Sequence, residues 1–339
     1  MRTNAEGFLY RAQEKCEEQS HRRRFRSDGR RIVSTDFSLP GLGIGIIAPS
    51  GALPEPEALD RAQARLMAAG AQLKVSAQAC TQYQRFAGDD LVRLSALHEY
   101  LDDPAVQLIL AARGGYGLTR LLPQIDFARL AASGKWLAGH SDFNTLQLAL
   151  LAQTGAPSLV GPMACYDFGA LETNADCLRW FAQALGRQTV QVQWQTTAER
   201  ISAEGTLWGG NLSVLVSLLG TPYFPQIERG ILFLEDINEH PYRIERMLLQ
   251  LQHAGVLDRQ HAILLGDFSS YRLTEYDAGY DLPTAFAAVA QRCSAPLVSG
   301  LPFGHCARKA SLPMGPAATL EVRDQNATLT FAGLDLLPA

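Results

Sequence analysis

The sequence predicts an α/β protein, with an N-terminal doubly wound, mostly parallel sheet domain and a C-terminal α/β domain that ends in a β-hairpin. First, a chain of 339 residues is long enough for about two domains. Second, short apolar runs alternate with amphipathic stretches from residue 42 onward, as expected for strands of a parallel sheet covered by helices. Third, the last stretch shows two alternating segments around a polar turn.

Changes in composition divide the chain into four segments. Residues 1–40 are charged and lack hydrophobic periodicity, so we expect a flexible extension. Residues 41–165 are predicted to form the N-terminal α/β domain and residues 201–339 the C-terminal α/β domain. Residues 166–200 are more polar and are expected to be a linker that contains one helix, "ADCLRWFAQAL".

In the N-terminal domain, strands and helices are expected to alternate. "LGIGIIAPSG", "AVQLILAARGGYG", "KWLAGHSD" and "PSLVGP" are apolar runs that end in turn residues, which is typical of buried strands. "EPEALDRAQARLMAAG", "DDLVRLSALHEYLDD" and "FNTLQLALLAQTG" have the spacing or composition of helices, and the first and last end on glycines suited to a C-cap.

The C-terminal domain is expected to continue the alternation. "GILFLED", "HAILLGDF" and "APLVSG" are predicted strands, and "HPYRIERMLLQLQHAG" and "LPTAFAAVAQRC" are predicted helices. Asn211 in "EGTLWGGNLSVLVSLLG" is a candidate helix cap. The final stretch, "ATLEVRDQNATLTFAG", is predicted to be a hairpin.

Composition argues against several classes of function. A net charge of −4 is unlike the basic face of a general nucleic-acid binder, and no apolar run approaches the roughly 20 residues of a membrane span. The six cysteines are scattered without a C-x-x-C pair, so we expect no metal site, no redox motif and a reducing compartment. We also expect no secretory signal, because the basic N-terminal region has no apolar core after it.

Ser141, in "GHSDF", lies where a predicted strand passes into a predicted helix. Backbone N–H groups at that helix start are unsatisfied, and an oxyanion formed beside the hydroxyl would meet them. The arrangement follows the logic of a nucleophile elbow without the G-x-S-x-G letters. The alternative is that Ser141 or Asp142 merely caps the helix.

A histidine and an acidic residue are expected at the same edge of the structure. His305 lies in a loop after the strand "APLVSG", whereas the ring of His140 should point away from its neighbour Ser141. Glu235 and Asp236 end an otherwise apolar strand, which is costly unless they are paired or cap the next helix. The residue pattern does not choose between these two acids. Serine, histidine and acid together suit acyl transfer.

The loop "ARGGYG" follows another buried strand. Its consecutive glycines, Gly114 and Gly115, either supply a second oxyanion donor or only form a tight turn, and the spacing does not fit a phosphate loop. Arg113 either holds a substrate carboxylate or makes a structural ion pair.

The motifs together resemble the LD-carboxypeptidases of serine-peptidase family S66, which include murein tetrapeptide carboxypeptidases and microcin C self-immunity proteins. The resemblance runs from about residue 44 to the C-terminus. It rests on "IAPSG", "ARGGYGLTRLLPQIDF", "GHSDF", "GPM", "EGTLWGGNLSVLVSLLGTPYFP", "LEDINEHPYRIERMLLQLQHAG", "YDAGY" and "GLPFGH…LPMG". One departure is Asn144, where relatives often have threonine, and no loss of activity is expected from it.

The resemblance implies a catalytic triad of Ser141 as nucleophile, Glu235 rather than Asp236 as the orienting acid, and His305 as base. It also implies an oxyanion hole made by the backbone N–H groups of Asp142 and Gly115. Candidate substrate-binding residues are Arg113 and Gly114, with Arg308 and Lys309 as further candidates for the terminal carboxylate.

The reaction implied is hydrolysis of the L,D peptide bond that releases the terminal D-alanine of cytoplasmic murein tetrapeptides during peptidoglycan recycling. The expected partner is a muropeptide substrate, with no cofactor, metal, nucleic acid or membrane, and the expected assembly is a homodimer. Two alternatives stay open. One is a microcin C-type peptidyl-nucleotide hydrolase that gives self-immunity, and the other is a non-catalytic muropeptide-binding protein.

Overall fold

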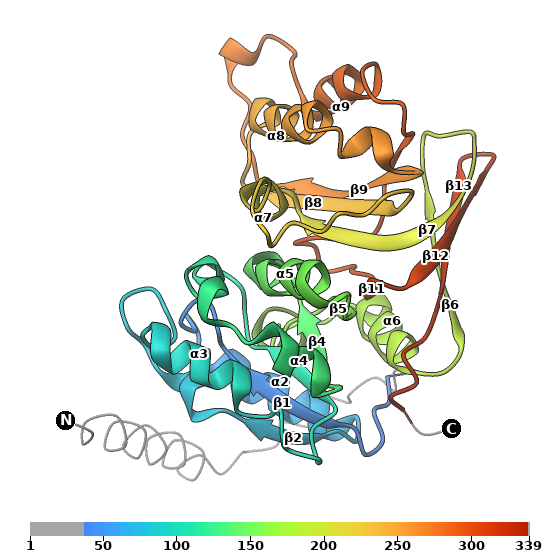
Figure 1. The fold of residues 1–339 in the computed structure, drawn as a ribbon. Coiled ribbons are helices and arrows are strands. Elements are labelled where there is room, and N and C mark those ends of the chain that lie inside the picture. The colour runs from blue at the N-terminus through green and yellow to red at the C-terminus, as the bar shows by residue number, and fades with distance from the viewer. Residues whose placement is uncertain (1–36, 338–339) are drawn as a thin grey trace.

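The computed structural model describes residues 37–337, which form two sheets flanked by helices (Figure 1). The first sheet has the strand order β11-β5-β4-β3-β1-β2, and its strands are parallel except for β11, which runs antiparallel to β5. The second sheet has the order β10-β9-β8-β7-β12-β13-β6. The predicted α/β class and the mainly parallel N-terminal sheet are confirmed.

The first domain alternates strands and helices as predicted, and it contains one strand, residues 72–75, and one helix, residues 127–132, that the sequence did not predict. Its strands are β1 (Gly43–Ile47), β2 (Gln72–Val75), β3 (Leu108–Ala111), β4 (Trp136–Gly139) and β5 (Ser158–Val160). Its helices are α2 (Glu57–Ala68), α3 (Asp90–His98), α4 (Phe127–Ala132) and α5 (Asn144–Thr154). Strands β1, β3 and β5 are buried along their whole length, which explains their continuous apolar sequence.

The second domain is a mixed sheet. Its strands are β6 (Thr189–Gln195), β7 (Arg200–Asn211), β8 (Ile231–Ile237), β9 (Ala262–Ser269), β10 (Leu297–Ser299), β12 (Ala317–Arg323) and β13 (Asn326–Ala332). The helices are α6 (Ala175–Leu185), α7 (Leu212–Ser217), α8 (Pro241–His253) and α9 (Leu282–Ala290). Strands β7 to β10 are parallel neighbours, and β7, β12, β13 and β6 are antiparallel.

The final hairpin forms as predicted, with β12 and β13 paired antiparallel. Asp324 and Gln325 connect them with φ of +48° and +63°. Positive φ at both central residues is the signature of a type I′ turn, whose twist matches that of the flanking strands.

The structure differs from the predicted boundaries at two places. Residues 166–200 are more than a linker, because they contain β6, which pairs with β13 and forms an edge of the second sheet. Strand β6 has the alternation of exposed polar and buried apolar side chains typical of a half-buried strand, which the prediction of a polar linker overlooked. At the other boundary, residues 1–36 of the predicted extension lie outside the described residues, whereas Phe37 and Leu39 are buried in the core.

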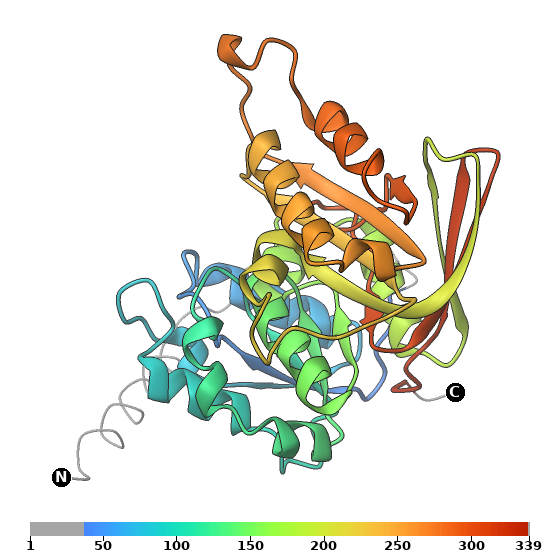
Figure 2. The same cartoon turned by 45° about the horizontal axis from the view of Figure 1, so that its top comes forward.

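The two domains meet along α5, which contacts both α7 and β7 (Figure 1). Strand β11 (Leu312–Met314) crosses back from the second domain to pair with β5 of the first. A view turned by 45° shows the segment between β9 and α9 reaching away from the body of the protein (Figure 2). None of the helices among residues 37–337 has the length and apolar character needed to cross a bilayer.

Candidate active site

Ser141 has a strained backbone at the C-terminal end of β4. Its φ is +62°, in the left-handed region that a residue with a Cβ rarely occupies. Such a conformation costs about 1–3 kcal/mol and persists only where the surroundings impose it, most often at functional sites. The strand-to-helix turn through Ser141 therefore has the form of a nucleophile elbow.

Neither Ser141 nor Asp142 caps the helix that follows. The short 3₁₀ turn Ser141–Phe143 and α5 both begin without a side-chain cap. Instead, the buried Asp142 carboxylate accepts a hydrogen bond from the N–H of Leu118 at 3.1 Å. Burial raises the pKa of the Asp142 carboxyl group, and backbone hydrogen bonds from Leu118 and Gly117 oppose that rise. Asp142 thus connects the serine turn to the glycine loop after β3, a side-chain role that the sequence did not indicate.

The glycine loop packs directly on the serine. A Cβ added to Gly114 would lie 2.8 Å from Ser141 Cβ, 3.0 Å from Ser141 Oγ and 3.3 Å from the Asp142 nitrogen. Only glycine permits this approach. Gly115, the next residue, is exposed and has a φ of +111°.

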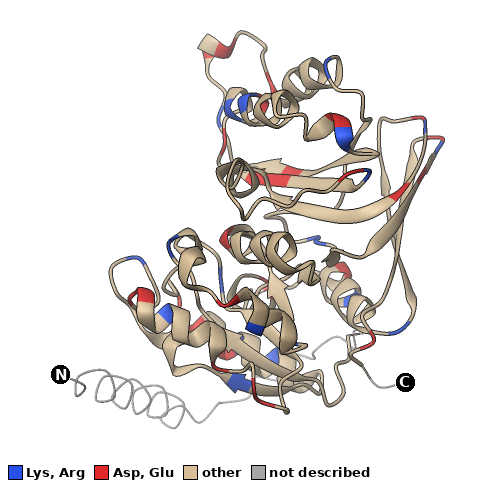
Figure 3. Cartoon of the chain, in the orientation of Figure 1, with Lys and Arg blue, Asp and Glu red and all other residues tan. Residues whose placement is uncertain are grey.

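Glu235 and His305 form a hydrogen-bonded pair. His305 Nδ1 lies 2.7 Å from Glu235 Oε2, and the Glu235 side chain is fully buried. Because an ionised carboxylate only accepts, Nδ1 carries the proton and Nε2 is left free to accept one. Figure 3, which colours the ribbon red at Asp and Glu, shows acidic residues within the otherwise apolar strand β8.

Asp236 faces a different set of partners. Its carboxylate accepts hydrogen bonds from Ser213 N at 2.8 Å, Ile237 N at 2.9 Å and Asn211 Nδ2 at 3.0 Å. Burial, reinforced by the charge of Glu235, raises the pKa of Asp236 to about 6. Of the two acids that the sequence left open, Glu235 is therefore the one that contacts His305.

Asn211 has more contacts than the predicted helix cap requires. Its Oδ1 accepts from Val214 N, as expected of a cap, while its Nδ2 also donates to Glu235 Oε1 at 3.1 Å. Its own N–H donates to Asn144 Oδ1 at 3.0 Å. Asn144 therefore connects the helix after Ser141 to the strand end beside Glu235.

The serine and histidine segments lie next to each other. The His140 ring, one residue before Ser141, lies 5.1 Å between centroids from the His305 ring, in an edge-on arrangement. The His140 ring itself contacts Gly161 and Lys309. The structure thus brings together the turn of Ser141, the glycine loop, and the Glu235–His305 pair.

The candidate carboxylate-binding residues have different surroundings. Arg113 is half-buried, donates to Ala52 O at 2.6 Å and pairs with none of the acids among residues 37–337. Arg308 is bound to Asp176 at 2.8 Å and lies over the Trp180 ring. Lys309 is completely buried, so it does not face a substrate.

Arg113 lines a cavity of about 420 Å³ beside the glycine loop, together with Gly115, Tyr116 and Arg85. Burial lowers the pKa of Arg113, and the positive charge of Arg85 lowers it further. Two guanidinium groups, with no carboxylate among the residues that line the cavity, make it suited to an anionic group.

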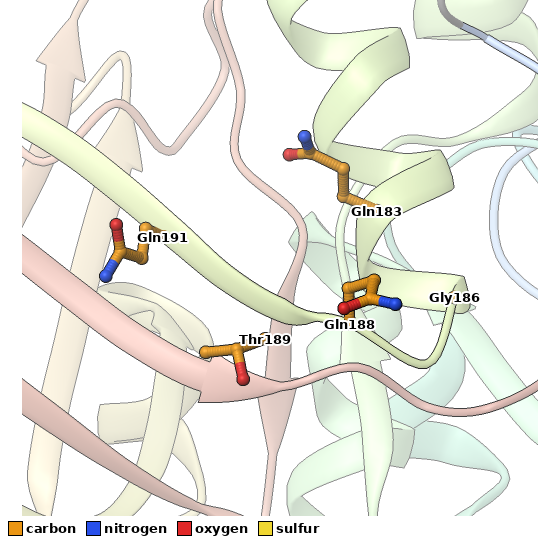
Figure 4. Close-up of a pocket in the computed structure, with 5 residues that line it drawn as sticks. All are labelled: Gln183, Gly186, Gln188, Thr189 and Gln191. Atoms are coloured by element: carbon orange, nitrogen blue, oxygen red, sulfur yellow. The ribbon is translucent and has the colours of Figure 1, made fainter.

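A second cavity, of about 520 Å³, lies between α6 and the start of β6 (Figure 4). Its lining is Gln183, Gly186, Gln188, Thr189 and Gln191, without a titratable side chain. It therefore offers no acid, base or nucleophile. Over the described part of the chain, no three His, Cys, Asp or Glu side chains are grouped so that they could hold a metal ion.

Comparison with known proteins identifies the family. Residues 44–161 match the LD-carboxypeptidase N-terminal domain and residues 204–320 match the LD-carboxypeptidase C-terminal domain. The chain belongs to the LD-carboxypeptidase family. It is therefore a hydrolase of the carboxypeptidase class, as the motifs predicted.

Several LD-carboxypeptidases resemble the whole two-domain body. The probable murein peptide carboxypeptidase of Bacillus subtilis is 33% identical over 84% of this chain and 91% of its own length. The murein tetrapeptide carboxypeptidase of Pseudomonas aeruginosa is 31% identical over 82% of this chain and 92% of its own.

Solved structures extend the similarity to the fold. The muramoyltetrapeptide carboxypeptidase of Oxalobacter formigenes is 42% identical, with a TM-score of 0.81 over 86% of this chain and 98% of its own. MccF in complex with glutamyl sulfamoyl guanosine has a TM-score of 0.80 over 88% of this chain and 99% of its own, but is 21% identical and so shows the fold alone.

Proposed function

We propose that this LD-carboxypeptidase releases the terminal D-alanine from murein tetrapeptides by means of a Ser141–Glu235–His305 triad. The observation that carries the proposal is the 2.7 Å contact between Glu235 and His305, next to a serine with left-handed backbone. The substrate class is supported by the names of the Pseudomonas and Oxalobacter relatives.

In the proposed reaction, His305 Nε2 takes the proton of Ser141 Oγ as that oxygen bonds to the carbonyl carbon before D-alanine. The oxyanion accepts hydrogen bonds from the N–H groups of Asp142 and Gly115. His305 then gives the proton to the nitrogen of the leaving D-alanine. A water molecule, deprotonated by His305, cleaves the ester, and the proton returns to Ser141. Glu235 holds the imidazole in the Nδ1–H form and stabilises its charged state.

An exopeptidase also recognises the free carboxylate of its substrate. We assign that role to Arg113, because its cavity adjoins Gly115 and its guanidinium has no acidic partner among the described residues. Gly114 contributes by letting the loop approach Ser141. Arg308 remains a weaker candidate, since its guanidinium group already forms an ion pair with Asp176.

The test is incubation of the purified protein with a murein tetrapeptide, followed by mass spectrometry. The wild type should release one D-alanine and Ser141→Ala should release none. Ser133→Ala should match the wild type, because the Ser133 hydroxyl, after α4, donates to Leu130 O and accepts from Lys135 N. Release by Ser141→Ala at the wild-type rate would exclude the triad. Folded wild type that cleaves a peptidyl-nucleotide but not the tetrapeptide would favour the self-immunity reaction. Binding of the tetrapeptide without cleavage would favour a muropeptide-binding protein.

We also propose a cytoplasmic location and a homodimer. The scattered cysteines without a C-x-x-C pair fit a reducing compartment. Cell fractionation tests the location, and light scattering coupled to gel filtration tests the dimer.

A further inference from the structure

A group of three charged or titratable side chains is buried behind the proposed triad and takes no part in the reaction described above. Lys309 Nζ lies 2.8 Å from Asp167 Oδ1 and 3.0 Å from His140 Nε2. The side chains of Lys309 and Asp167 are 0% and 4% exposed, and His140 is fully buried. We call His140, Asp167 and Lys309 the lysine cluster.

The contacts determine the state of His140. Its Nδ1 lies 2.9 Å from the carbonyl oxygen of Gly161. Because a carbonyl only accepts, Nδ1 carries the proton, and Nε2 accepts from the Lys309 ammonium group. Burial, and then the charge of Lys309, hold the pKa of His140 well below its ordinary range. His140 is therefore neutral, and its tautomer is fixed by its two neighbours.

The lysine cluster joins three separate segments of the chain. His140 directly precedes Ser141, and Lys309 follows His305 by four residues in an irregular loop. Asp167 belongs to the π-helical turn Ala164–Phe168, where its Oδ2 accepts from Met163 N at 2.7 Å.

Tyr166, in the same turn, adds two contacts. Its hydroxyl donates to the backbone oxygen of His305 at 3.2 Å, and its ring lies 4.9 Å from the Lys309 ammonium group. The backbone of the base is thus attached to the same turn that supplies the carboxylate of the lysine cluster.

We propose that the lysine cluster positions the base against the nucleophile, by fixing the His305 loop to the strand end that carries Ser141. The proposal rests on the proposed triad. His140, Asp167 and Lys309 are positioning residues, because none of them exchanges a proton with the reacting atoms. A buried ion pair is often no more stabilising than an apolar pair of the same size, so such a pair can be kept for the arrangement it imposes. The lysine cluster should accordingly affect kcat more than melting temperature.

The test replaces the ion pair without leaving a buried charge. In Lys309→Met combined with Asp167→Asn, the asparagine oxygen still accepts from Met163 N, and both sites are neutral. We expect the Tm to stay within about 3 °C of the wild type. We expect kcat on the tetrapeptide to fall about 100-fold, the scale for a misplaced catalytic group, with KM within about threefold. Lys74→Met is the matched control. Lys74 lies on the edge strand β2 and forms an exposed ion pair with Asp103, so this variant should keep the wild-type kcat.

The wild-type protein provides a second measurement that does not depend on activity. With ¹⁵N-labelled histidine, nuclear magnetic resonance should show His140 of the wild type as the neutral Nδ1–H tautomer at pH 6. In the double variant Nδ1 still donates to Gly161 O, and the pKa of His140 should rise because the charge of Lys309 is gone. A double variant that keeps both its Tm and its kcat would overturn the proposal, as would a wild-type His140 protonated at Nε2. If the double variant does not fold, the wild-type tautomer decides. If wild type does not cleave the tetrapeptide, the proposed function fails instead, and the tautomer still tests the lysine cluster.

Discussion

Gly114→Ala should disable Ser141, the proposed nucleophile, while leaving the fold in place. The new Cβ would lie 2.8 Å from Ser141 Cβ, whereas ordinary van der Waals contact begins at 3.4 Å, so relief needs a shift of about 0.6 Å. The φ of Gly114 lies outside the left-handed region, so alanine brings no backbone strain of its own. Misplacement by about 1 Å costs about 100-fold in rate, so we expect kcat to fall about 10- to 100-fold, or about 1.4–2.7 kcal/mol.

The assay compares the rate of D-alanine release with melting temperature. Overpacking of this kind costs about 1–3 kcal/mol of stability, which a two-domain protein should survive. Gly186→Ala is the control, because its Cβ would meet no atom closer than 3.5 Å and its φ is −79°. If Gly114→Ala is folded and keeps kcat within twofold of the wild type, the close packing of the glycine loop on Ser141 does not control the reaction.

Three further predictions concern the acids and the cavity. Glu235→Gln should lower kcat about 10⁴-fold at neutral pH, because an amide neither fixes the His305 tautomer nor stabilises its charge. Steady-state kinetics on the folded variant measure this loss, and a kcat close to that of the wild type would contradict it. Asp236 has a pKa of about 6 in the folded protein, above the ordinary value of 3.8, so the folded state binds this proton more tightly. Its contribution to the free energy of unfolding is therefore full below pH 4 and falls by about 3 kcal/mol as the pH rises through 6. Urea unfolding of the wild type and of Asp236→Asn between pH 4 and 7 measures this loss of stability. The same dependence of the free energy of unfolding on pH in both proteins would contradict the prediction. Arg85→Gln should raise KM about 3- to 10-fold for the tetrapeptide acid but not for the tetrapeptide with a C-terminal amide, and an equal change for both substrates would remove Arg85 from carboxylate recognition.

Local patterns predicted the regular elements that position the site. The buried strands were visible as continuous apolar runs, and the helix ending at Gly155 has that residue in the left-handed conformation, with φ of +72°. Strand β2 was missed because it is only four residues long and half of its side chains are exposed. Strand β11 was missed because Pro313 stands in its middle, and a proline within a short run argues against a strand.

Long-range partners were beyond what the residue pattern could give. Lys309 and Asp167 are 142 residues apart in the chain, and no local signal connects them. For the same reason the sequence offered Lys309 as a residue for the substrate, whereas the structure buries it. The choice between Glu235 and Asp236 came from the family resemblance, and the contact with His305 gives it a geometric basis.

The return of the chain through β11 has a consequence for motion. Only Gly315 and Pro316 separate β11 in the first sheet from β12 in the second. Both are held to β7, since Gly315 N donates to Leu207 O and Leu207 N donates to Pro316 O. A connection this short and this well bonded cannot lengthen to let the domains swing apart. Relative motion of the two sheets at this crossing would therefore have to break these hydrogen bonds, and cutting the chain between residues 166 and 200 would leave the first sheet without its own outer strand.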